Sequence, residues 1–156
     1  MPLKIESSAF APGAEISIRH TGEGEDLSPP LAWSGLPPGT KSLALIVDDP
    51  DAPDPAAPRM VWAHWVLFNI PPSTTSLSEG VRTLPGGTGE GLNYWKRTGY
   101  GGPAPPIGRH RYFFKLYVLD EKLRLAGTPT KAQLEKAMRG HILAQATLIG
   151  MYEAQR

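Results

Sequence analysis

The sequence contains no cysteine. This absence excludes disulfide bonds, a thiolate nucleophile and thiolate ligands for a metal. An excess of charge of one sign is also lacking, because 16 Lys and Arg residues face 15 Asp and Glu residues and leave a formal net charge of +1. Such a chain has none of the basic excess that nucleic-acid-binding proteins carry, so we expect no nucleic-acid partner.

Long apolar runs are missing too. No segment approaches the roughly 18 consecutive apolar residues of a membrane-spanning helix, so we expect no membrane span. The stretch from Met1 to Glu6 contains no apolar core of a signal peptide, and we expect a cytoplasmic protein, with a periplasmic location left open. A hydrophobic content of 40% and a charged content of 20% fit one ordinary globular domain, residues 1–156.

Proline and glycine, by contrast, are abundant, with 17 of each. They separate short apolar runs, which is the pattern of many short strands joined by tight turns. Strands are expected at residues 16–20, 31–33, 42–48, 62–70 and 112–120. Residues 71–109 are expected to be a long, largely irregular loop with a short strand near Val81, and loops of that length in compact domains usually serve a function.

The C-terminal part predicts helices. Thr130 with Gln133 three residues later forms a capping-box pattern, and Leu134, Ala137 and Met138 form an apolar stripe after it. A second helix is expected over residues 142–153, after a break at Gly140. Strands followed by helices predict a mostly β fold with C-terminal helices, either a β-sandwich or an α+β arrangement.

Polar residues stand where three of the expected strands reach the surface. Asp49 follows the strand at 42–48, His64 lies near the start of the strand at 62–70, and His110 and Tyr112 begin the last strand. If the first two strands pair antiparallel and the third runs in the direction of the second, these four side chains gather at one edge of the sheet.

A cluster of this kind suits an oxyanion, because imidazoles and a phenol donate hydrogen bonds. The glycine-rich stretch 99–103 could add backbone N–H groups. Asp49 would repel a fully ionised phosphate, but it could hold an imidazole in one tautomer or raise its pKa. Arg111 is expected to be structural and to pair with Asp51 or Asp48.

Other interpretations stay open at this point. Asp49 and Asp51 could simply shape turns, and His64 could be an ordinary core histidine. An Asp/His pair could perform acid–base hydrolysis of a phosphate ester, although the chain has neither a Gly-x-Ser-x-Gly elbow nor a phosphate loop. A metal could bind Asp49, Asp51, His64 and His110, but local two-histidine spacing is absent, and we expect no metal and no cofactor.

Four short motifs follow one another along the chain: Asp49-Pro50-Asp51-Ala52-Pro53, Trp62-Ala63-His64-Trp65, Gly101-Gly102-Pro103 and Gly108-Arg109-His110-Arg111-Tyr112. In this order and at these separations they resemble the phosphatidylethanolamine-binding protein family, also called Raf kinase inhibitor proteins, in its bacterial and archaeal branch. The resemblance implies a β-sandwich core with a shallow anion pocket.

The resemblance also implies a set of ligand-binding residues: Asp49, Trp62, His64, Gly102, His110 and Tyr112. Three further residues, Asp51, Pro53 and Arg111, are expected to support them. The implied function is non-enzymatic binding of phosphate, phosphoryl headgroups or carboxylates, with a kinase or a protease as a possible protein partner and a homodimer as a possible assembly.

Overall fold

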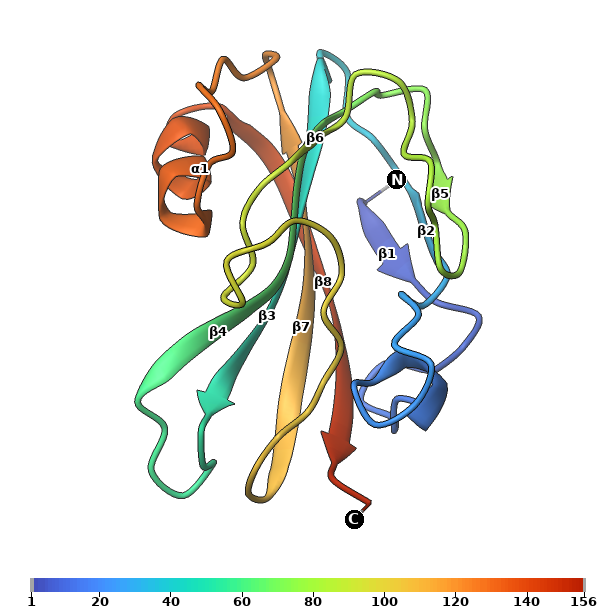
Figure 1. Ribbon diagram of the computed structural model, residues 1–156. Coiled ribbons are helices and arrows are strands. Elements are labelled where there is room, and N and C mark those ends of the chain that lie inside the picture. The colour runs from blue at the N-terminus through green and yellow to red at the C-terminus, as the bar shows by residue number, and fades with distance from the viewer. Residues whose placement is uncertain (1, 156) are drawn as a thin grey trace.

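Two antiparallel sheets pack face to face in the computed structural model, which describes residues 2–155 (Figure 1). The larger sheet has the strand order β6-β4-β3-β7-β8, and the smaller has the order β1-β2-β5. The strands of the larger sheet are β3 (Ser42–Ala52), β4 (Met60–Ile70), β6 (Gly89–Glu90), β7 (Arg109–Leu119) and β8 (Ile142–Glu153). Those of the smaller sheet are β1 (Lys4–Glu6), β2 (Leu31–Ser34) and β5 (Ser76–Leu77).

The larger sheet is buried on both faces. One face packs with the smaller sheet, where Leu45 and Leu116 meet Trp33 in one core. The other face packs against the helix α1 (Lys131–Met138), whose Leu134 belongs to a second core with Ile46. Figure 1 shows α1 and the smaller sheet on opposite sides of the larger sheet. Burial on both faces explains why the central strands are almost continuously apolar.

The strand β3 is the centre of the larger sheet and pairs antiparallel with both β4 and β7. Asp49 therefore lies opposite Trp62, and Asp48 lies opposite Phe113. The C-terminal end of β3 and the starts of β4 and β7 consequently meet at one edge of the sheet. This pairing confirms the arrangement on which the predicted convergence of Asp49, His64 and His110 depended.

A β-bulge lies at His64. The register passes from Val47 opposite Trp65 to Asp48 opposite Ala63, so that β4 contains one extra residue at this point. Strict alternation along a strand would place His64 and Val66 on the same face. The bulge breaks the alternation, so Val66 enters the core under α1 while His64 points toward Tyr112 on the other face.

The helix α1 confirms the first expected helix, and its N-cap Thr130 forms the predicted capping box with Gln133. None of the helices formed by residues 2–155 is long and apolar enough to cross a bilayer. The second expected helix, at 142–153, was wrong, because this segment is the strand β8 and pairs with β7 along its whole length. The apolar spacing fitted a helix, but pairing with the long edge of β7 overrides that local preference.

Two shorter expectations were also wrong. Residues 16–20 do not form a strand: Ile18–His20 is a 3₁₀ turn capped by the Ser17 side chain, which accepts a hydrogen bond from the Arg19 N–H. The region of Val81 is not a strand either, and the loop 71–109 instead contributes β5 and β6. The fold class was confirmed as mostly β, with one helix near the C-terminus.

Gly150 offers a test of how the N-terminal segment covers the larger sheet. A Cβ at this position would lie 2.6 Å from Ile16 Cγ1 and 2.8 Å from Phe10 Cε2. We expect Gly150→Ala to lower the free energy of unfolding by about 1–3 kcal/mol, because the crowded core side chains must shift. Urea denaturation measures this. Gly86→Ala, whose added Cβ meets nothing within 4 Å, is the control and should leave stability nearly unchanged.

Candidate functional site

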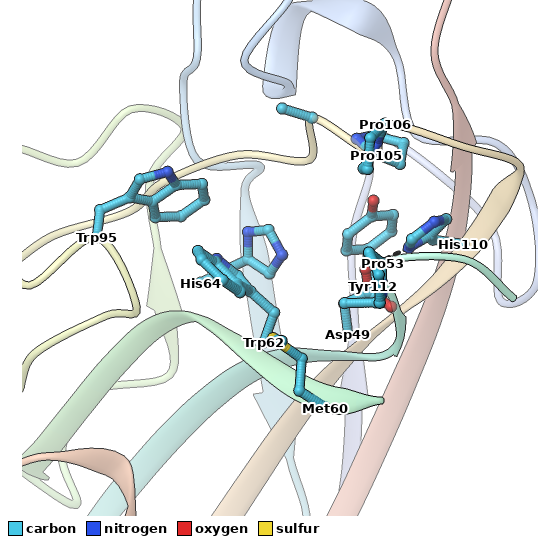
Figure 2. A pocket seen from close by; sticks show the side chains of 12 residues that line it. Asp49, Pro53, Met60, Trp62, His64, Trp95, Pro105, Pro106, His110 and Tyr112 are labelled. Atoms are coloured by element: carbon cyan, nitrogen blue, oxygen red, sulfur yellow. Dashed lines mark hydrogen bonds and ion pairs between the residues drawn. The ribbon is translucent and has the colours of Figure 1, made fainter. Parts of the chain in front are cut away.

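A cavity of about 290 Å³ opens at the edge where the three central strands meet. Its lining includes five of the six residues expected to bind a ligand, and also Pro53: Asp49, Pro53, Trp62, His64, His110 and Tyr112. Figure 2 shows Trp95 and His64 on one side of the cavity and Tyr112 and His110 on the other. The remaining wall is apolar: Ala52, Met60, Ala104, Pro105 and Pro106.

His64 enters the cavity from the bulge in β4. Its Nδ1 lies 2.7 Å from the carbonyl oxygen of Gly101, in the long loop before β7. Because a carbonyl oxygen only accepts, Nδ1 carries the hydrogen. Burial lowers the pKa of His64 to about 4, so the ring is neutral near pH 7 and its Nε2 is an acceptor.

Asp49 and His110 form a buried pair. Asp49 Oδ2 lies 2.6 Å from His110 Nδ1, and Asp49 Oδ1 accepts a hydrogen bond from the backbone N–H of Asp51. The other ring nitrogen of His110, Nε2, donates to the carbonyl oxygen of Ile107 at 2.7 Å. Burial raises the pKa of the Asp49 carboxyl, while the bond to His110 opposes that rise. Both nitrogens of His110 are therefore used inside the protein.

The pair of Asp51 and Arg111 lies beside the cavity. The guanidinium donates from Nε and Nη2 to the two carboxylate oxygens, each at 2.9 Å, and the Arg111 backbone N–H donates to Oδ2. These hydrogen bonds lower the pKa of Asp51. Asp48, the other carboxylate that the sequence offered to Arg111, lies on the opposite face of β3 and pairs with Lys115 at 2.9 Å. Arg111 thus fixes the C-terminal end of β3 and is not among the residues that line the cavity.

Two neutral donors remain at the cavity. The Tyr112 hydroxyl stays protonated, because burial and the nearby Asp49 carboxylate raise its pKa. The indole Nε1 of Trp62 is buried and has no hydrogen-bond partner within residues 2–155. Trp62 packs edge-on against Trp95, with ring centroids 5.5 Å apart, and this contact orders one apolar wall.

The sixth expected ligand-binding residue, Gly102, is placed differently. It is buried behind the cavity wall, and its N–H donates to Asp26 Oδ1 at 2.7 Å. A Cβ there would lie 2.6 Å from the carbonyl oxygen of His20, so glycine allows this close backbone approach. The neighbouring Gly101 N–H donates to the His64 carbonyl oxygen, and neither N–H faces a ligand.

Sequence reasoning missed part of the wall. Trp95 comes from the long loop and lines the cavity. The one sequence signal for it was the pair of adjacent aromatic residues Tyr94-Trp95 in that loop. Met60 and Ala104 carried no signal, because small and flexible apolar side chains occur everywhere in a domain. The geometry does not support the alternative of a metal site. Among the described residues, no three His, Asp or Glu side chains come together as a metal site would require.

The buried neutral His64 predicts a pH-dependent stability. The unfolded chain takes up a proton on His64 near its ordinary pKa of 6.5, whereas the native ring takes one up only near 4. The stabilisation is therefore complete above pH 6.5 and is lost as the pH falls to 4, by about 3 kcal/mol. Urea denaturation at several pH values should show a smaller loss for His64→Asn, whose amide can keep the donor to Gly101. Equal losses in both proteins would contradict this assignment.

Comparison with known proteins agrees with this geometry. The family model described as phosphatidylethanolamine-binding protein matches residues 6–153. A UPF0098 protein of Methanothermobacter thermautotrophicus is 48% identical over 96% of this chain and 98% of its own. A UPF0098 protein of Chlamydia muridarum is 41% identical over 97% of this chain and 99% of its own.

Solved structures share the fold over the whole chain. A putative phosphatidylethanolamine-binding protein homolog from Chlamydia trachomatis superposes with a TM-score of 0.90 at 40% identity, covering 99% of both chains. E. coli YbcL, described as a member of the mammalian family, gives 0.89 at 33% identity, covering 99% of this chain and 100% of its own. A carboxypeptidase Y inhibitor, at 19% identity, 98% of this chain and 83% of its own, and a TM-score of 0.60, shares the fold alone. The sequence motifs, the two packed sheets and these matches together show that the chain belongs to the phosphatidylethanolamine-binding protein family.

Proposed function

We propose that this protein binds a small molecule through a phosphate-like or carboxylate group held in the cavity at the edge of the larger sheet. The observation that carries the proposal is a gathering of polar groups in an otherwise apolar hollow, where the Trp62 N–H is buried without a hydrogen-bond partner within residues 2–155. The Tyr112 hydroxyl, the Trp62 N–H and the His64 Nε2 all belong to residues that line it. Buried polar groups normally have partners, so a ligand that accepts a hydrogen bond from Trp62 would supply the partner that residues 2–155 do not.

The size and walls of the cavity favour a headgroup over a large substrate. A volume of about 290 Å³ admits a phosphoryl group with a short substituent. The apolar rim includes Met60, 43% exposed, and Trp95, 39% exposed, and it would contact the remainder of the ligand. Affinity for a free anion should therefore be weaker than affinity for a substituted one.

Binding is favoured over hydrolysis by the way in which the Asp49–His110 pair is bonded. A general base must have a free nitrogen within reach of the proton that it removes. His110 donates from Nε2 to Ile107 and shares a proton with Asp49 through Nδ1. Neither nitrogen is open to a substrate, so the pair orders the cavity and does not perform acid–base chemistry.

The hydroxyl of Tyr112 provides the test of the binding site. We expect Tyr112→Phe to weaken binding of O-phosphoethanolamine about five- to tenfold, because one hydrogen bond to the anion is lost. Titration calorimetry, or the fluorescence of Trp62 and Trp95, measures the affinity. Tyr117→Phe makes the same chemical change on the opposite face of the sheet and is the matched control. Equal affinity in the Tyr112 variant and the wild type would count against the cavity as the site.

We further propose that the protein forms a homodimer through the free edge of β8. Backbone groups of Ile149 and Met151 on this edge pair with residues 13–16, but strand alternation places those of Gln145 and Thr147 on the same edge, where no group of residues 2–155 pairs with them. Residues 142–152 contain no charged side chain, and Leu143 is 43% exposed. A long, apolar, uncharged edge favours pairing with another strand, and a second β8 related by a two-fold axis is complementary to it.

The dimer can be tested by molar mass in solution. Light scattering should give twice the chain mass of 16.9 kDa for the wild type. Gln145→Lys combined with Thr147→Lys should give the monomer mass, because like charges would face each other across the two-fold axis. Ser73→Lys places a lysine on an exposed turn that is not part of β8, and it is the control. A monomeric wild type would contradict this proposal without affecting the ligand site.

A further inference from the structure

Besides the Asp49–His110 pair, the polar side-chain atoms that residues 2–155 present at the cavity are two donors and one acceptor. His64 Nδ1 is held by the Gly101 carbonyl oxygen at 2.7 Å, which leaves Nε2 with a lone pair toward the cavity. The donors are the Tyr112 hydroxyl and the Trp62 N–H. Figure 2 shows the imidazole of His64 beside the phenol of Tyr112, and the two rings are in edge-to-face contact with their centroids 5.3 Å apart.

Within residues 2–155, no lysine or arginine side chain lines the cavity. The guanidinium of Arg111, beside the cavity, is held by Asp51 through two hydrogen bonds. The Asp49–His110 pair is neutral as a unit, whether its shared proton lies on the ring or on the carboxyl group. Among the side chains of residues 2–155, a dianion in the cavity would therefore meet the acceptor Nε2 of His64 and a pair with no net charge, and no lining side chain would compensate its charge.

We propose that the cavity selects oxyacids that still carry an acidic proton, and that His64 Nε2 recognises this proton by accepting a hydrogen bond from it. The inference rests on the binding function proposed above. A P–O–H group donates to His64 Nε2, while the unprotonated oxygens of the same phosphoryl group accept from Tyr112 and Trp62. A fully deprotonated oxyanion has no hydrogen to offer and brings a lone pair against the lone pair of Nε2.

Three probes separate protonated from unprotonated oxyanions of similar size. Inorganic phosphate carries a proton throughout the range from pH 5 to 8. O-phosphoethanolamine carries one on its phosphoryl group mainly below about pH 6, where a phosphomonoester takes up its second proton. Sulfate carries none anywhere in this range.

The expected affinities differ accordingly. At pH 7, phosphate should bind at least tenfold more tightly than sulfate in titration calorimetry. Binding of O-phosphoethanolamine should weaken about tenfold for each pH unit above 6, because its monoanion becomes rarer by that factor. At pH 7.5, calorimetry in buffers of different ionisation enthalpy should show uptake of about one proton for each O-phosphoethanolamine bound.

The titratable groups around His64 must be distinguished from the ligand as the source of any pH dependence of binding. Asp49 and His110 face it across the cavity as a mutually bonded pair, and Tyr112 faces it from β7 with its pKa raised by burial. His64 itself takes up a proton only near pH 4 in the free protein. A pH dependence of binding between 6 and 8 that is seen with O-phosphoethanolamine and not with sulfate would therefore originate in the ligand.

A variant tests the role of His64 directly. In His64→Gln the side-chain amide can turn an N–H toward the ligand, and the preference for phosphate over sulfate should shrink to less than threefold. His141→Gln, which replaces a partly exposed histidine held by Asp120 and Glu121, should keep the wild-type preference. If His64→Gln does not fold, the proton uptake by the wild type decides the question alone.

The outcomes distinguish this inference from the function on which it rests. Sulfate binding as tight as phosphate binding, or an O-phosphoethanolamine affinity that is constant from pH 5 to 8, would overturn the selection by His64 and leave the anion site standing. Failure of all three probes to bind at any pH in this range would remove the proposed function itself, and the inference with it.

Discussion

The position of β3 at the centre of the larger sheet is the constraint on which the site depends. Because β3 pairs antiparallel with both β4 and β7, its C-terminal end meets the starts of both neighbours. Parallel pairing on either side would send one of those starts to the far edge, about eleven strand residues away. The hydrogen-bond ladder of the sheet thus brings Asp49, His64 and His110 to one cavity.

The resulting cavity has mainly apolar walls with a few polar groups, and these groups carry little net charge. Burial would make each isolated charge costly, and the fold instead pairs the charged groups at and beside the cavity or keeps the groups neutral. Asp49 is bonded to His110, Arg111 is bonded to Asp51, and His64 is kept neutral by burial. Recognition must therefore depend on the direction of hydrogen bonds and on apolar contact more than on attraction between opposite charges. A surface cluster of lysines would have been a different kind of anion site.

Much of the fold could be predicted because the three central strands are long apolar runs. Runs of this kind can be buried only as core elements, and 42–48, 62–70 and 112–120 all proved to be strands. The segment 142–153 was misassigned because its spacing of alanine, leucine and tyrosine suits a helix as well as a strand. The choice between them came from β7, whose open edge offers hydrogen bonds along the whole segment. The capping box at Thr130 was predictable because it needs only local side chains.

The sequence by itself determined which residue types were available and which strands they would terminate, since apolar runs and the residues that follow them are local properties. Tertiary structure alone decided how those residues act. The bulge that turns His64 toward the cavity and the Gly101 carbonyl that fixes its tautomer lie 37 positions apart in the chain and meet only through folding. The same holds for His110, whose two ring nitrogens are bonded to Asp49 and to the carbonyl oxygen of Ile107. Hydrogen-bond direction depends on relative positions in space, which periodicity and composition do not specify.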